Sequence, residues 1–150
     1  MLFTIRNTIP NTELCKFNII SENGYMGVID SDNNSVILPI QYDNIFVYGE
    51  NIFVLHKKGK IGAVKIDSNN FFFIAQCEYD TLDTFGHDLI FCNSETVRYY
   101  NSTTGNIRNF IDVRVDSPFL YCKDNNYQYI IYPETDEELS YNEEGEINSL

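Results

Sequence analysis

Residues 24–65 decide the fold of this chain, because two similar segments open and close the stretch. The segments read, in order, Gly-Tyr-Met-Gly-Val-Ile-Asp (24–30), Ser-Val-Ile-Leu-Pro-Ile-Gln-Tyr-Asp-Asn-Ile (35–45), Ile-Phe-Val-Leu-His-Lys-Lys (52–58) and Gly-Lys-Ile-Gly-Ala-Val-Lys (59–65). Gly24 and Gly27 return as Gly59 and Gly62, 35 residues later. A return at a fixed spacing predicts a protein built of repeats.

Apolar runs alternate with turn-forming residues along the chain, which is typical of β-strands joined by short turns. Asn, Asp and Gly tolerate the backbone conformations that turns require. They predict turns at residues 30–34, 57–60, 67–70 and 101–105. The side chains that we expect to be buried are Val28, Ile37, Phe53, Val64, Phe72 and Ile90. We therefore expect an all-β protein with little helix, at most a short helical turn near residues 134–141.

The second copy of the repeat follows the first. Tyr42-Asp43 recurs as Tyr79-Asp80, and these pairs are expected to anchor a corner through Tyr packing and Asp hydrogen bonds to backbone N–H groups. The copies span residues 24–58, 59–95 and, in a weaker form, 96–123, followed by a segment 124–150, all within a single domain of residues 1–150. About three to four units of roughly 35 residues predict tandem antiparallel meanders, forming one curved sheet, a sandwich or a barrel-like body.

The pattern Gly-x-x-Gly-Val-Ile-Asp, Val-Ile-x-Pro-x-x-Tyr-Asp-x-Ile and Gly-Lys-x-Gly resembles the WG repeat family of bacterial β-repeat proteins. The resemblance covers residues 24–95 well and residues 96–132 poorly. It is degenerate, because the chain has no Trp, and Met26 and Ile61 stand where the family prefers Trp. The resemblance implies stacked β units that serve as a non-catalytic binding scaffold, and it supplies no catalytic residues. Gly27 and Gly62 are expected to allow a close backbone approach or a bulge.

The chain is strongly acidic, with 22 Asp and Glu against 10 Lys and Arg and a net charge of −12 at pH 7. Nucleic acid is therefore a poor candidate ligand, because binding phosphates requires a basic face. A basic protein is the favoured partner, since opposite charges steer association. The alternative is that the acidic surface only keeps the protein in solution.

The charge is concentrated at the C-terminal end. Residues 124–150 hold eight acidic residues and no Lys or Arg, so −8 of the −12 lies there. Tyr side chains lie among these acids, and Tyr supplies contact area while carboxylates pair with Lys and Arg. The expected partner-binding residues are Tyr132, Glu134, Asp136, Glu137, Glu138, Tyr141, Glu143 and Glu144. The alternative is a solvated, partly disordered tail.

No pattern in the chain predicts catalysis, a metal site or a cofactor. The opening Asp30-x-Asp32-x-Asn34 lacks the Gly and the Glu that complete a calcium loop. No apolar run is long enough for a membrane-spanning helix. Scattered cysteines without a C-x-x-C pair predict reduced, mostly buried thiols in a cytoplasmic protein. They are Cys15, Cys77, Cys92 and Cys122.

These features predict a non-enzymatic protein-binding module. Its most concrete form is an acidic immunity protein that neutralises a cationic toxin, such as a nuclease, by blocking the site where the toxin binds phosphates. The alternative is a generic structural or interaction module of the WG type without an inhibitor role. An enzyme is the least favoured class. A toxin-like reading frame beside the gene would favour the immunity function over the generic module.

Overall fold

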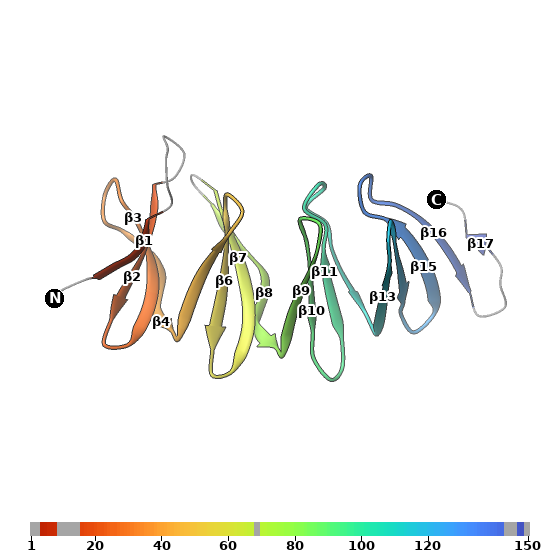
Figure 1. Ribbon diagram of the computed structural model, residues 1–150, viewed down its shortest axis with the longest axis horizontal. Coiled ribbons are helices and arrows are strands. Elements are labelled where there is room, and N and C mark those ends of the chain that lie inside the picture. Colours follow the sequence, from red (N-terminus) through yellow and green to blue (C-terminus); the bar gives the residue numbers. More distant parts are fainter. Residues whose placement is uncertain (1–3, 9–15, 68–69, 143–146, 149–150) are drawn as a thin grey trace. The chain divides into compact units, whose positions relative to one another are not determined.

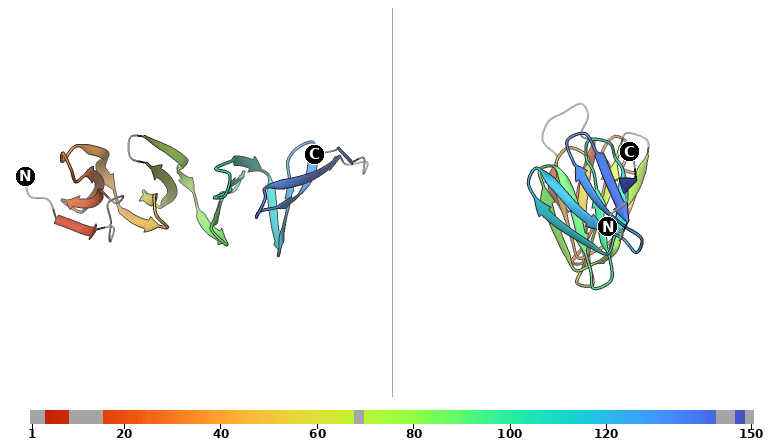
Figure 2. Two further views of the ribbon diagram at one scale, coloured as in Figure 1. Left: turned by 90° about the horizontal axis from the view of Figure 1, so that it is seen from above. Right: turned by 90° about the vertical axis from the view of Figure 1, so that its right-hand side faces the viewer.

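The computed structural model describes residues 4–8, 16–67, 70–142 and 147–148. These ranges contain strands and connecting turns and no helix (Figures 1 and 2), so the predicted all-β class is confirmed. The described strands form four antiparallel sheets, in which strands that are neighbours in sequence are also hydrogen-bonded neighbours. The chain divides into two compact units, Met1–Glu78 and Tyr79–Leu150.

Two four-stranded sheets make up the first unit. Sheet A contains β1 (Thr4–Thr8), β2 (Phe17–Glu22), β3 (Tyr25–Asp30) and β4 (Val36–Tyr42). Sheet B contains β5 (Asn44–Tyr48), β6 (Ile52–Lys57), β7 (Lys60–Ile66) and β8 (Phe71–Tyr79), whose last residue opens the second unit.

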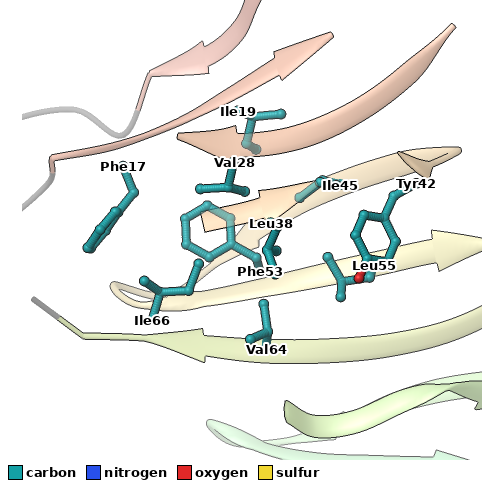
Figure 3. Close-up of a cluster of buried hydrophobic side chains, with 10 residues drawn as sticks. All are labelled: Phe17, Ile19, Val28, Leu38, Tyr42, Ile45, Phe53, Leu55, Val64 and Ile66. Carbon is teal, nitrogen blue, oxygen red and sulfur yellow. The ribbon is translucent and has the colours of Figure 1, made fainter. Parts of the chain in front are cut away.

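Sheets A and B share one apolar core, because alternate residues of their strands face a common interior (Figure 3). Sheet A supplies side chains from β2, β3 and β4, and sheet B supplies them from β5, β6 and β7. The buried members are Phe17, Ile19, Val28, Leu38, Tyr42, Ile45, Phe53, Leu55, Val64 and Ile66.

The second unit also contains two sheets. Sheet C contains β9 (Thr81–Phe85), β10 (Asp88–Cys92), β11 (Val97–Tyr100) and β12 (Ile107–Phe110). Sheet D contains β13 (Asp112–Asp116), β14 (Phe119–Lys123), β15 (Tyr127–Tyr132), β16 (Glu137–Asn142) and β17 (Ile147–Asn148). Their shared apolar cluster has the buried members Ile90, Val97, Tyr99, Phe110, Leu120, Cys122 and Ile131.

Two glycines allow strands to approach more closely than any side chain would permit. A Cβ atom added at Gly27 on β3 would lie 2.6 Å from the carbonyl oxygen of Leu38, where the β3–β4 register also shifts. A Cβ atom added at Gly62 on β7 would lie 2.5 Å from the carbonyl oxygen of Ala75. The expected close approach is confirmed at both positions.

The predicted turns follow from local hydrogen bonds. The Asn34 N–H donates to the Asp30 carbonyl oxygen, and the Gly105 N–H donates to that of Asn101, each closing a turn. Lys58 and Gly59 have φ of 52° and 76° between β6 and β7. In the turn predicted at 67–70, residues 68–69 lie outside the described part of the chain.

The predicted corner uses the Tyr-Asp pairs. Tyr42 and Tyr79 are both buried. The Asp43 carboxylate accepts the Lys58 N–H at 2.7 Å, as expected. Backbone bonds repeat as well, because Asp43 N–H donates to the His56 carbonyl oxygen and Asp80 N–H to that of Cys92.

The burial predictions are confirmed for Val28, Phe53, Val64 and Ile90. Ile37 is only half-buried, and the prediction for Phe72 is wrong, because its side chain is 42% exposed. Phe73 and Cys77 pack against the core of the first unit, so Phe72 lies on the opposite face of β8. Three consecutive Phe residues gave no alternation from which to choose the face.

The segment near 134–141, for which we expected at most a short helical turn, contains a turn and a strand and no helix. The N–H of Asp136 donates to the Tyr132 carbonyl oxygen, and Asp136 has a φ of 59°, so the chain reverses. Residues Glu137–Asn142 then form β16, which pairs with β15. A left-handed residue ends any helix, and Asp tolerates this conformation.

The cysteines differ in burial. Cys122 is buried, whereas Cys77 and Cys92 are half-buried, so the expectation of mostly buried thiols is correct only for Cys122. All three are free, and Cys15 lies outside the described residues. Burial raises the pKa of the Cys122 thiol to about 12, and it also raises the pKa of Cys77 and Cys92.

Replacing Gly62 by Ala is expected to lower the free energy of unfolding by about 3 kcal/mol, because the added methyl group meets a backbone carbonyl. The control is Gly49→Asn, at a φ of 64° with open space around a Cβ atom. Asn tolerates this conformation, so its cost should be about 1 kcal/mol or less. Urea unfolding measures both. Equal losses would show that the close approach at Gly62 is not a constraint.

Alkylation with iodoacetamide near neutral pH is expected to leave Cys122 unmodified in the folded protein, since only the thiolate reacts and burial disfavours it. Cys77 and Cys92 should react slowly, and all should react rapidly in denaturant. Peptide mass spectrometry identifies each site. Rapid native labelling of Cys122 would contradict its placement in the core.

Candidate functional site

The acidic, Tyr-rich segment forms strands of sheet D. Residues Tyr127–Tyr132 form β15, which pairs with β14 on one side and β16 on the other. Asp124 starts the segment by accepting the N–H groups of Asn126 and Tyr127 and the hydroxyl of Tyr129. Burial alone would raise the pKa of Asp124, but these hydrogen bonds outweigh it and lower that pKa.

Sheet D has an inner face that contributes to the core of the second unit. Leu120, Cys122 and Ile131 are buried in the cluster that also contains Ile90 and Tyr99 of sheet C. Strand register places Leu120 opposite Ile131 and Cys122 opposite Tyr129. Since successive side chains of a strand point to opposite faces, the residues between them form a second, outer face.

The outer face of sheet D consists of the alternate residues of four adjacent strands. β13 supplies Asp112, Arg114 and Asp116, and β14 supplies Phe119, Tyr121 and Lys123. β15 supplies Gln128, Ile130 and Tyr132, and β16 supplies Glu137, Leu139 and Tyr141. None of these side chains is buried. Half of the twelve residues are aromatic or aliphatic, so this face combines apolar area with charge.

Contacts within the outer face arrange its aromatic rings. The rings of Phe119 and Tyr132 lie 5.7 Å apart, and the Arg114 guanidinium lies 4.5 Å from the centre of the Tyr121 ring. The Tyr141 hydroxyl donates to the Gln128 side chain at 3.2 Å. These contacts hold amphipathic side chains on the surface without covering them.

Two of the predicted binding carboxylates instead connect sheet D to sheet C. The Glu138 Oε2 lies 2.7 Å from Nη1 of Arg108, whose guanidinium also lies over the Phe110 and Tyr129 rings. The Asp136 Oδ2 accepts hydrogen bonds from the Thr104 hydroxyl and the Asn106 amide, both at 2.8 Å. Asp136 and Glu138 therefore form contacts within the second unit.

The other predicted residues that the structure describes lie on or beside the outer face. Glu137, Tyr132 and Tyr141 belong to it, and the Glu134 carboxylate accepts the Tyr132 hydroxyl at 2.6 Å. This hydrogen bond raises the pKa of Tyr132. Glu143 and Glu144 lie outside the described residues. The structure thus brings together four of the eight residues and separates Asp136 and Glu138 from them.

Sequence reasoning missed Phe119, Tyr121, Ile130 and Leu139, which supply much of the apolar area of the outer face. A signal was present in Phe119-Leu120-Tyr121-Cys122, where every residue is apolar or aromatic. Such a strand places apolar side chains on both faces. The acidic composition of residues 124–150 indicates a charged surface and gives no sign of these apolar side chains.

Comparisons with known proteins do not place the chain in a family. No family model matches it, and no curated protein matches it. A chain in an S. cerevisiae complex of dbp5 with nup159 and gle1 is similar over 99% of this chain and 43% of its own, with 10% identity and a TM-score of 0.36. The N-terminal domain of Nup159 is similar over 90% of this chain and 40% of its own, with 9% identity and a TM-score of 0.34.

An extracellular domain of a one-component system from B. thetaiotaomicron is similar over 88% of this chain and 23% of its own, with 9% identity and a TM-score of 0.34. The chain therefore spans less than half the length of these three structures. Similarity at this level carries no information about function.

The described residues contain no group of three His, Cys, Asp or Glu side chains that could hold a metal ion. In the same part of the chain, no helix has the length and hydrophobicity of a membrane span.

Replacing Glu138 by Gln is expected to lower the free energy of unfolding by about 1 kcal/mol, because the ion pair with Arg108 is lost while both side chains are partly exposed. The matched change Glu137→Gln, one residue away on the outer face, should alter stability by less than about 0.5 kcal/mol. Urea unfolding compares the two variants. Equal effects would contradict the assignment of these neighbours to opposite faces.

Proposed function

We propose that this chain is a non-enzymatic protein-binding module that uses the outer face of sheet D to bind a basic protein. The observation that carries the proposal is the set of six aromatic and aliphatic side chains on adjacent strands of that face. They are Phe119, Tyr121, Ile130, Tyr132, Leu139 and Tyr141. Phe119 and Leu139 are each 38% exposed. Contiguous exposed apolar side chains of this kind are typical of a surface that binds another protein.

The composition of the face suits a protein partner. Tyr is enriched at protein interfaces because its large ring makes extensive contact and its hydroxyl remains able to form hydrogen bonds. The hydroxyl groups of Tyr132 and Tyr141 already have acceptors in Glu134 and Gln128. Little side-chain entropy then remains to be lost on binding, which favours affinity.

Charge determines the kind of partner. The face carries three acidic residues, Asp112, Asp116 and Glu137, and Glu134 lies beside it. Its basic residues are Arg114 and Lys123, and the whole chain has a net charge of −12. Arg114 is already 3.5 Å from the Asp116 carboxylate. A basic protein gains from long-range attraction to this chain, and the carboxylates at the edge pair with its Lys and Arg side chains.

The most concrete form of this function is that of a cytoplasmic immunity protein, an inhibitor of a cationic toxin such as a nuclease. A nuclease binds phosphates with basic side chains, and an acidic surface offers carboxylates to the same side chains. The alternative is a generic module of the WG type that binds without inhibiting. The two differ in whether the bound partner loses an enzymatic activity.

The architecture that we propose for the module is a tandem β repeat. The sequence copy 24–58 starts at the β2–β3 turn and ends at the β6–β7 turn, so one copy contributes strands to both sheet A and sheet B. The equivalent positions Gly27 and Gly62, and Tyr42 and Tyr79, support this arrangement through their matching environments.

Capture from a lysate of the native cell tests the proposal when the bait is compared with two variants. Phe119→Ala combined with Leu139→Ser removes apolar area from the outer face. Tyr25→Ala combined with Val36→Ser removes similarly exposed side chains, 48% and 56%, from the first unit. We expect the parent chain to capture a basic protein. The dissociation constant of that complex should rise at least tenfold for the first variant, because central interface residues dominate affinity, and it should stay unchanged for the second.

Equal binding by both variants would contradict the outer face as the binding surface. The purified partner then distinguishes the two forms of the function. Loss of its enzymatic activity on titration with this chain supports the inhibitor, and retention of the activity in the complex supports the generic module.

A further inference from the structure

A cleft of about 370 Å³ lies at one end of the second unit, where four turns meet. The β9–β10 turn contributes Gly86 and His87, and the β11–β12 turn contributes Ser102 and Thr103. The β13–β14 turn contributes Ser117 and Pro118, and the β15–β16 turn contributes Pro133 and Glu134. The volume is at the small end of the range for ligand clefts, so it suits a ligand about as large as one amino-acid side chain.

The lining of the cleft includes a buried carboxylate. Asp88, at the start of β10, is only 4% exposed. Its Oδ2 accepts the Tyr99 hydroxyl at 2.7 Å, and its Oδ1 accepts the N–H and hydroxyl of Ser102 at 2.8 and 2.9 Å. All of these donors are neutral, and no described Lys, Arg or His forms an ion pair with Asp88.

Asn101 holds this arrangement in place. Its side-chain amide donates to the Tyr99 hydroxyl and to the Pro133 carbonyl oxygen, both at 2.9 Å. Its side-chain oxygen accepts the N–H groups of Thr103 and Thr104. Burial and the adjacent Asp88 carboxylate raise the pKa of Tyr99, which keeps its hydroxyl a donor. The cleft is therefore built on side chains with fixed partners.

The walls of the cleft combine apolar rings with oxygen acceptors. Phe85, Pro118 and Pro133 supply flat apolar surfaces, and Ser102, Thr103 and Ser117 supply hydroxyl groups. Glu134 adds a second carboxylate, and the lining contains no Lys or Arg. A planar guanidinium stacks on rings and donates several hydrogen bonds to carboxylates and hydroxyls. A buried carboxylate also gains from a cation that neutralises it.

The cleft is continuous with the outer face of sheet D. Glu134 lines the cleft and accepts the hydroxyl of Tyr132, which belongs to the face. Pro118 lines the cleft, and the ring of the next residue, Phe119, lies 5.7 Å from that of Tyr132 in a tilted arrangement. A partner that covers the face can therefore place one side chain in the cleft.

We propose that the cleft receives an arginine side chain of the bound partner, with its guanidinium between Glu134 and Asp88. This inference rests on the proposed function for the source of the arginine, whereas the affinity of the cleft for a guanidinium does not depend on it. Arg is among the residues that dominate binding energy at interfaces, so the cleft would be the anchor of the complex.

The test uses a small probe and needs no partner. N-acetyl-arginine amide is titrated into the isotopically labelled full chain, with N-acetyl-citrulline amide as the neutral match, and binding is followed by NMR. We expect the arginine probe to shift the signals of His87, Ser102, Ser117 and Glu134 with a dissociation constant on the order of 1 mM. Citrulline should cause no such shifts. Glu134→Gln should weaken the binding of the arginine probe by about tenfold, whereas Glu50→Gln, at an exposed carboxylate of the first unit, should leave its binding unchanged.

Equal shifts with citrulline, shifts that map elsewhere, or full binding by the Glu134→Gln variant would overturn the inference. The side-chain amide oxygen introduced by Glu134→Gln can still accept the Tyr132 hydroxyl, so a preserved spectrum shows that the fold is intact. Failure of the arginine probe leaves the capture experiment with the outer-face variant unaffected. Failure of that capture experiment, in turn, leaves the probe result standing.

Discussion

The apolar side chains of a small sheet leave water only when a second sheet covers them, and this requirement organises the described structure. In the first unit, Val28 and Leu38 of sheet A meet Phe53 and Val64 of sheet B in a common core. Gly27 allows β3 to approach β4 closely in sheet A, and Gly62 allows β7 to approach β8 closely in sheet B. In the second unit, sheets C and D are joined in the same way through Tyr99, Leu120 and Ile131.

The same requirement gives sheet D its second property. Its inner face packs against sheet C through apolar side chains. The hydrogen bonds of Asp136 and the ion pair of Glu138 also connect the two sheets. Its outer face carries rings and aliphatic side chains that no described residue buries. Alternation along β16 therefore places neighbouring acids on opposite faces, so that Glu138 pairs with Arg108 while Glu137 lies exposed on the outer face.

Much of the fold could be predicted from the sequence because its signals are local. Asn, Asp and Gly define turns, and the recurrence of Gly27 as Gly62 marks a close strand approach. The face of Phe72 could not be predicted, because Phe71-Phe72-Phe73 has no alternation. The strand at 137–142 was missed because Asp136 reverses the chain through its left-handed backbone, which composition does not encode.

The candidate site was predicted only as a region. Its charge and Tyr content are visible in the sequence, but the partners of Glu138 and Asp136 lie 30 and 32 residues away, at Arg108 and Thr104. Such long-range pairs follow from strand register between different sheets. The cleft at the turns of the second unit has the same origin, since Asp88, Ser102, Ser117 and Glu134 meet only in the folded chain.

The central claim is that one face of sheet D packs against sheet C while the other is exposed to solvent. Hydroxyl-radical footprinting of the isolated chain tests it most directly, with the oxidised residues identified by peptide mass spectrometry. We expect rapid oxidation of Phe119 and Leu139 and strong protection of Leu120 and Ile131, although Phe119 and Leu120 are adjacent in sequence. Comparable oxidation of Phe119 and Leu120, or protection of Phe119 and Leu139 in the free protein, would contradict it.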